Sequence, residues 1–100
     1  MVVLLEQSAR HTLLASLPGW CEIDGGSAIQ RKLVFADFNT AFGFMAQVAL
    51  YAERHDHHPD WQNVWNKVQI TLSTHEVGGV SQRDIDMARF IDTLCPPTNP

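Results

Sequence analysis

The sequence has little of what would place it in a membrane, in an oxidising compartment or on nucleic acid. No apolar run approaches the roughly 20 residues that a membrane-spanning helix requires. The apolar opening, residues 1–5, is too short for a signal-peptide core, lacks a basic leader and is followed by Glu6. Cys21 and Cys95 form no CxxC motif and are expected to be free thiols. We therefore expect a cytoplasmic protein without membrane contact.

A basic surface is also missing. The chain has 7 Lys and Arg against 11 Asp and Glu, and Arg31 and Lys32 are the only adjacent basic pair. Because phosphate contacts depend mainly on clustered Lys and Arg, this balance argues against direct binding of nucleic acid. Hydrophobic residues make up 45% of the 100 residues and charged ones 18%, which is typical of one compact domain. We expect a single domain over residues 1–95 and a disordered, proline-rich tail over residues 96–100.

Hydrophobic periodicity and turn residues divide the chain into helices and strands. Ser8, Asp37 and Ser81 are candidate N-caps, and Ser81 with Asp84 three residues later forms a capping-box pattern. The predicted order is a helix at about 8–16, strands at 20–23 and 28–35, a helix at 38–55, strands at 62–64 and 67–74, and a helix at 82–94. This α-β-β-α-β-β-α order predicts an α+β fold, a two-layer sandwich in which helices pack on one face of a four-stranded antiparallel sheet.

The helix predicted over residues 38–55 is apolar on more than one side. One face carries Phe38, Ala41, Phe42, Met45, Val48, Ala49 and Ala52, and Phe44, Leu50 and Tyr51 lie off it. A helix that is apolar on two sides needs a second burial surface. We expect a partner subunit of a homodimer or homotetramer to provide that surface; crowding by the first and last helices of the same chain is the alternative.

Histidine is concentrated in one part of the chain. His55, His57, His58 and His75 fall within 21 residues, near a helix exit and a strand end, where pockets form. Imidazole both gives and takes protons near neutral pH, so the cluster indicates general acid–base catalysis. A metal site is the second interpretation, although no HExxH motif, paired cysteines or tight carboxylate cluster completes a ligand set. The third is that these histidines are solvent-facing or satisfied in the core.

Neighbouring residues also allow two interpretations each. Trp61 and Trp65 could form an aromatic wall for a flat heterocycle or could pack in the core, and for Trp65 we expect core packing. Glu53 could orient a histidine or merely solvate the helix end. Asp84 is expected to serve as a helix-start residue.

The spacing of these residues resembles the signature of the pterin-4a-carbinolamine dehydratases. The motif Glu53-x-x-x-His57-His58-Pro59 is followed by Trp65, His75 and Asp84 at the family's spacing. Segments 17–20, 35–38, 57–64 and 68–76 agree as well, so the resemblance spans about residues 10–94. Trp65 stands where the family often has tyrosine, which affects packing detail.

The resemblance implies an activity and a set of site residues. The family dehydrates 4a-hydroxytetrahydrobiopterin, left by pterin-dependent aromatic amino acid hydroxylases, to the quinonoid dihydropterin. No metal and no organic cofactor is implied, because the pterin is the substrate. By resemblance, the catalytic residues are His57, His58 and His75. The implied substrate-binding set is Glu53, Asp56, His57, His58, Pro59, Trp61, Thr74, His75, Glu76 and Val77.

Other functions stay open at this point. Animal relatives act as dimerisation cofactors of a homeodomain transcription factor through a helical surface, so a protein partner could bind the long-helix face. A dehydratase acting on another pterin, for instance in molybdenum cofactor metabolism, is the remaining alternative.

Overall fold

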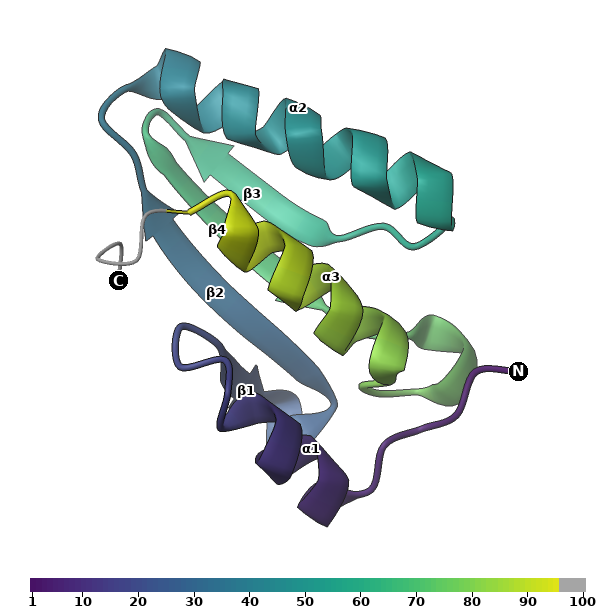
Figure 1. The fold of residues 1–100 in the computed structure, drawn as a ribbon. Helices are drawn as coiled ribbons and strands as arrows, with labels where there is room; N and C mark the ends of the chain where they lie inside the picture. Colours follow the sequence, from purple (N-terminus) through teal and green to yellow (C-terminus); the bar gives the residue numbers. More distant parts are fainter. Residues whose placement is uncertain (96–100) are drawn as a thin grey trace.

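A computed structural model describes residues 1–95 (Figure 1). In chain order the elements are α1 (Gln7–Leu14), β1 (Cys21–Ile23), β2 (Ala28–Val34), α2 (Phe38–His55), β3 (Asp60–Val64), β4 (Lys67–Leu72) and α3 (Gln82–Thr93). Two 3-10 turns, η1 (Asp24–Gly26) and η2 (His75–Val77), connect β1 to β2 and β4 to α3. The predicted order of helices and strands is confirmed. The predicted tail, residues 96–100, lies outside the described residues.

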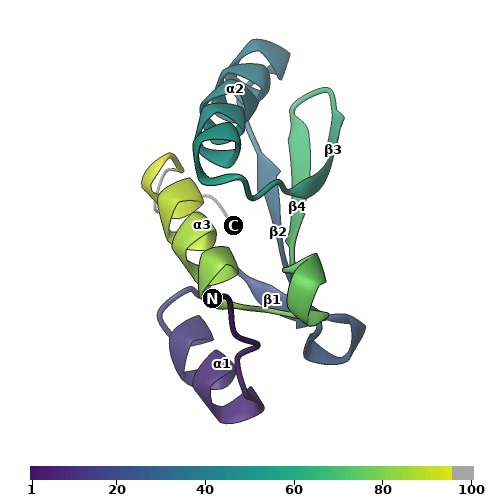
Figure 2. The ribbon, with the colours of Figure 1, turned by 90° about the vertical axis from the view of Figure 1, so that its right-hand side faces the viewer.

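The strands form one antiparallel sheet with the order β1-β2-β4-β3. Ile29 faces Leu72 and Leu33 faces Val68 across the central pair, so the apolar positions of β2 and β4 share one side of the sheet. Seen edge-on, the three helices lie on that side and leave the other side uncovered (Figure 2). The α+β two-layer architecture is therefore confirmed.

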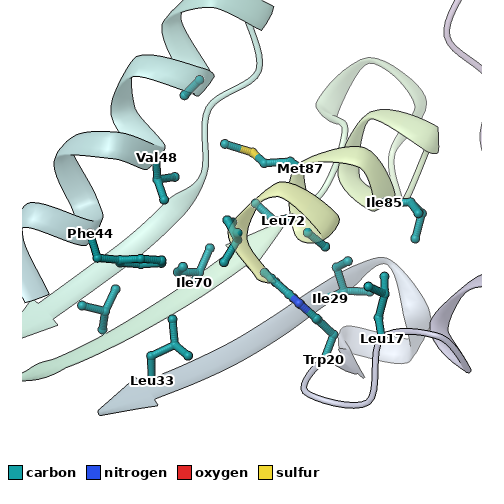
Figure 3. Packing of buried hydrophobic residues seen from close by; sticks show 14 of the residues in the cluster. Leu17, Trp20, Ile29, Leu33, Phe44, Val48, Ile70, Leu72, Ile85 and Met87 are labelled. Atoms are coloured by element: carbon teal, nitrogen blue, oxygen red, sulfur yellow. The ribbon is translucent and has the colours of Figure 1, made fainter. Parts of the chain in front are cut away.

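The core lies between the helices and the sheet (Figure 3). Ile70 of β4 and Ile85 of α3 are both fully buried there. The other labelled members of this cluster are Leu17, Trp20, Ile29, Leu33, Phe44, Val48, Leu72 and Met87. Within residues 1–95, no helix is long and apolar enough to cross a membrane.

Polar caps fix where the two longer helices begin. Asp37 accepts a hydrogen bond from the backbone N–H of Thr40 at 2.7 Å, and this bond lowers the pKa of the Asp37 carboxyl. Ser81 and Asp84 form the predicted capping box at the start of α3. Ser8, by contrast, lies inside α1, which begins one residue earlier without a side-chain cap.

Two expectations about apolar residues were wrong. Phe44 faces the core, whereas Phe38 and Phe42 are 50% and 57% exposed, so the buried face of α2 is rotated from the predicted one. Trp65 is 63% exposed rather than packed in the core, because it occupies the tight β3–β4 turn with φ +52°. Trp61 is partly buried and packs against the core.

Candidate active site

His57 lies just beyond the C-terminus of α2, in a turn that directs its imidazole inward. Asp56 adopts a left-handed conformation with φ +50°, which Asp tolerates better than most residues. The N–H groups of Asp56 and His57 donate to the carbonyls of Glu53 and Ala52 at 3.4 and 3.1 Å. These two bonds form a Schellman motif that ends the helix. His57 is only 8% exposed, although it lies in the loop between α2 and β3.

The buried imidazole is held by a carboxylate from another element. Nε2 of His57 lies 2.6 Å from Oδ1 of Asp84, at the start of α3. Oδ2 of Asp84 accepts from the Thr74 hydroxyl at 2.8 Å and from the Ser81 backbone N–H at 2.9 Å. Asp84 is fully buried and Thr74 is 2% exposed. His57, Thr74, Ser81 and Asp84, which we call the buried network, therefore join α2, η2 and α3 at one point.

His58, the next residue, is exposed. Its Nε2 lies 3.3 Å from Oε1 of Glu53, and both side chains are mostly in solvent. An exposed pair of this kind contributes little to stability. Glu53 therefore contacts His58 rather than His57.

His75 begins η2, directly after Thr74, and is exposed. Gly78 ends this turn with φ +67°, a conformation that glycine adopts readily. The next residue of the turn, Glu76, accepts from Nη1 of Arg83 at 3.0 Å. Through Thr74, the segment that carries His75 is connected to the carboxylate that holds His57.

A small hollow opens beside His57, between the end of α2 and the start of α3. Its volume is about 160 Å³, and its lining residues are Tyr51, His55, His57, Arg83 and Asp86. The rings of Tyr51 and His55 stack with a centroid separation of 4.0 Å. Burial, with a smaller contribution from Asp86, raises the pKa of the Tyr51 phenol, so this hydroxyl stays neutral at physiological pH. Within residues 1–95, no group of three or more His, Cys, Asp or Glu side chains could hold a metal ion.

Comparison with known proteins places the chain in a family. Residues 3–94 match the family described as pterin 4 alpha carbinolamine dehydratase. The chain belongs to the pterin-4-alpha-carbinolamine dehydratase family.

Relatives in this dehydratase family cover the chain from end to end. Proteins from Rhodopseudomonas palustris (strain BisB18) and Burkholderia vietnamiensis (strain G4 / LMG 22486) are 52% and 51% identical over 100 residues. Each alignment covers the whole chain and 99% or 98% of the relative, and both relatives are named "Putative pterin-4-alpha-carbinolamine dehydratase". The chain is also similar to a crystal structure of a transcriptional coactivator/pterin dehydratase from Brucella melitensis. That comparison has a TM-score of 0.91 and 49% identity, and covers 94% of this chain and all of the other.

The dehydratase signature residues do not all converge in the structure. His57 meets Asp84, and Asp84 meets the side chain of Thr74, so the two predicted binding segments lie together. His58 and Glu76 instead contact Glu53 and Arg83. Asp56 ends α2, Pro59 follows His58 in the loop before β3, and Val77 completes η2.

Sequence reasoning missed the second role of Asp84. The signature placed Asp84 in the same motif as His57, but the capping-box pattern already accounted for the carboxylate, so no bond between these two residues, 27 positions apart, was predicted. Tyr51, Arg83 and Asp86 were also missed as neighbours of His57, whereas His55 belonged to the predicted histidine cluster. Only the packing of α3 beside the end of α2 brings these residues together.

Proposed function

We propose that this chain dehydrates 4a-hydroxytetrahydrobiopterin to the quinonoid dihydropterin and water, in the recycling of tetrahydrobiopterin for aromatic amino acid hydroxylases. The observation that carries the proposal is the imidazole of His57, held by the buried carboxylate of Asp84 at the edge of a hollow. A histidine held by a buried carboxylate is oriented for proton transfer. The family match supports the substrate class.

The reaction needs two proton transfers and no redox partner. The proton on N5 is removed, the C4a–O bond breaks, and the leaving hydroxyl takes a proton and departs as water. His57 and His75 share the acid and base roles in this proposal, since neutral imidazole accepts a proton and imidazolium donates one. His58 binds or orients the pterin, or serves the other stereoisomer of the C4a hydroxyl. Neither a metal ion nor an organic cofactor takes part.

Substrate contacts are assigned to two segments. Residues 57–59 and residues 74–77 would bind the pterin, with backbone groups of the second segment at the edge of the ring. Glu53 and Asp56 would set the polarity behind the histidines, and Trp61 would flank them. The shared contacts of His57 and Thr74 with Asp84 support this arrangement because they hold the two segments beside each other.

The exposed apolar face of α2 favours a second function, in protein association. Phe38, Phe42 and Leu50 of α2 are exposed apolar residues, and the similar Brucella melitensis protein is called a transcriptional coactivator as well as a pterin dehydratase. We propose that this helix face forms homo-oligomers or binds a protein partner. Phe42→Asp should then abolish assembly or partner capture and leave turnover unchanged. Phe44 is unsuitable for this test because it is buried in the core.

Stopped-flow absorbance tests the dehydratase proposal. Enzymatically generated 4a-hydroxytetrahydropterin is followed with and without the protein, in the presence of a chelator. We expect acceleration that survives chelation and is lost in His57→Ala. Absence of acceleration by folded protein would contradict the proposal for this substrate. It would favour another pterin substrate, such as one of molybdenum cofactor metabolism, or the binding role.

A further inference from the structure

The buried network has more hydrogen bonds than helix capping requires. A capping box needs the Ser81 hydroxyl on a backbone N–H of the first turn and the Asp84 carboxylate on the Ser81 N–H. Here Asp84 also receives the Thr74 hydroxyl and faces His57, and Ser81 also contacts Thr74. Three of the four side chains are at most 2% exposed. Such a site must satisfy every polar atom, so its protons can be placed by elimination.

The direction of each hydrogen bond follows from the donors available. The Ser81 N–H can only donate, and its partner is Oδ2 of Asp84. The Thr74 hydroxyl gives its one proton to the same oxygen, so the Ser81 hydroxyl must donate to Thr74. The Ser81 oxygen in turn accepts from the Arg83 N–H at 3.2 Å. The hydrogen bonds therefore run in one direction, from the Arg83 N–H through the hydroxyls of Ser81 and Thr74 to the carboxylate of Asp84.

The last contact of the network is the one with His57. Oδ1 of the Asp84 carboxylate can only accept, so Nε2 of His57 carries a proton and donates it. Nδ1 has no hydrogen-bond partner among residues 1–95, and the imidazole keeps 9% exposure where it lines the hollow. In neutral His57, Nδ1 therefore bears the lone pair.

We infer that Asp84, itself fixed by Thr74 and Ser81, is a positioning residue that selects the Nε2–H tautomer of His57, so that His57 exchanges protons with substrate through Nδ1. The catalytic consequence rests on the proposed dehydratase function, but the tautomer does not. The proton exchanged with substrate is then accepted and released at Nδ1 of His57.

The network predicts an unusual result for Asp84→Asn. The Ser81 N–H still needs an acceptor, so the amide oxygen must take the place of Oδ2 and the amide NH₂ must face His57. An NH₂ group donates, which forces Nε2 to accept and moves the proton to Nδ1. The nearly isosteric change should therefore reverse the tautomer. In serine proteases the corresponding amide substitution keeps the geometry and lowers kcat about 10⁴-fold because the tautomer is wrong.

Two-bond ¹H–¹⁵N correlation spectra of ¹⁵N-labelled protein distinguish the tautomers. Spectra are recorded at about pH 9, where histidine is ordinarily neutral, and His57 is assigned by comparison with His57→Ala. We expect Nε2–H in the wild-type chain and Nδ1–H in Asp84→Asn. Asp37→Asn is the matched control, because it makes the same amide substitution at the cap of α2 and should leave the tautomer and turnover unchanged.

Several results would overturn the inference. Nδ1–H in the wild-type chain would do so without any variant, so the test survives if Asp84→Asn does not fold. The same tautomer in wild type and folded Asp84→Asn would also reject it. If wild-type protein lacks turnover but the tautomer reverses as expected, the proposed dehydration fails and the positioning role of Asp84 stands.

Thr74 provides a separate readout. Thr74→Val removes the hydroxyl at nearly constant volume and loosens the carboxylate, so kcat should fall about tenfold with little change in KM. Thr74→Ser should restore most of the lost turnover. If Thr74→Val and Thr74→Ser have the same turnover, the Thr74 hydroxyl takes no part in positioning His57.

Discussion

The two ends of α3 each carry an aspartate that binds a basic side chain from another element, but the two pairs differ in kind. At the N-terminal end Asp84 is fully buried and binds His57. At the C-terminal end Asp92 remains 27% exposed and binds Arg31 of β2, and it also accepts from the indole N–H of Trp20 at 2.8 Å. One helix thus holds an imidazole at one end and a guanidinium at the other.

The difference between the partners shows how similar contacts can serve different purposes. Guanidinium is permanently charged and cannot exchange a proton near neutral pH, so Arg31 connects β2 to α3 without any acid–base role. Imidazole exchanges protons readily, and His57, although as buried as Arg31, lines a hollow. One end of α3 therefore carries a structural ion pair between Arg31 and Asp92, which we call the clamp. The other end holds the proposed catalytic group, His57.

Removing the titratable side chains should have the largest effect. We expect His57→Ala and His75→Ala each to lower kcat about 10²–10⁴-fold, because each removes one acid–base group. Stopped-flow absorbance gives kcat, and circular dichroism checks the fold. His11→Ala, at an exposed histidine of α1, is the control and should leave turnover unchanged. Wild-type turnover in both active-site variants would contradict the assigned roles.

Removing the fixed charge should affect stability instead. Among residues 1–95, Arg31→Met leaves Asp92 with Trp20 as its side-chain partner. We expect the free energy of unfolding to fall by about 2 kcal/mol, a value that already allows for the partial exposure of Asp92. Urea unfolding measures this change. The kcat of the folded variant should stay near the wild-type value, so a selective loss of turnover would contradict the proposed division between the two ends of α3.

Crowding the same clamp should have a smaller effect. A Cβ at Gly19 would lie 2.9 Å from Cζ of Arg31, so Gly19→Ala must displace the guanidinium from its place. We expect a loss of about 1–2 kcal/mol in the free energy of unfolding. Gly43→Ala is the control, since a Cβ there would meet nothing within 4 Å. Gly43→Ala should be at least as stable as the wild type, because alanine is favoured over glycine in a helix interior. Wild-type stability of Gly19→Ala would show that Arg31 is less constrained than its burial indicates.

The smallest effect concerns the thiol beside the clamp. Burial raises the pKa of Cys95, and the Asp92 charge adds to this shift while Arg31 opposes it. Less thiolate is therefore present at a given pH, and Cys95 should react with iodoacetamide more slowly than the exposed Cys21 at pH 8. Mass spectrometry of labelled peptides measures both rates. Faster labelling of Cys95 would show that this end of α3 opens readily.

The sequence specified the elements better than it specified their faces. Period-2 alternation in β2 and β4 and the caps at Asp37 and Ser81 predicted the fold, because these signals are local. The buried face of α2 was misassigned because the helix is apolar nearly all round, so its own pattern does not indicate which side meets the sheet. Phe44 and Phe42 differ only in what the rest of the chain places beside them.

The candidate site was predicted in part for a similar reason. The clustered histidines marked the region, since their number is visible in the sequence. The bond between His57 and Asp84 depends on the packing of α3 beside the end of α2, and no local pattern encodes that packing. Asp84 already had a sufficient local explanation as a capping residue, which concealed its contact with the imidazole.

The most direct test of this account compares the same substitution at the two ends of α3. Turnover of 4a-hydroxytetrahydropterin is measured for Asp84→Asn and Asp92→Asn, each checked for folding by circular dichroism. We expect kcat to fall at least about 10²-fold in Asp84→Asn, because His57 is then held in the wrong tautomer, and to change less than about threefold in Asp92→Asn. Equal turnover in the two folded variants would contradict the claim that the carboxylate of Asp84 prepares His57 for catalysis.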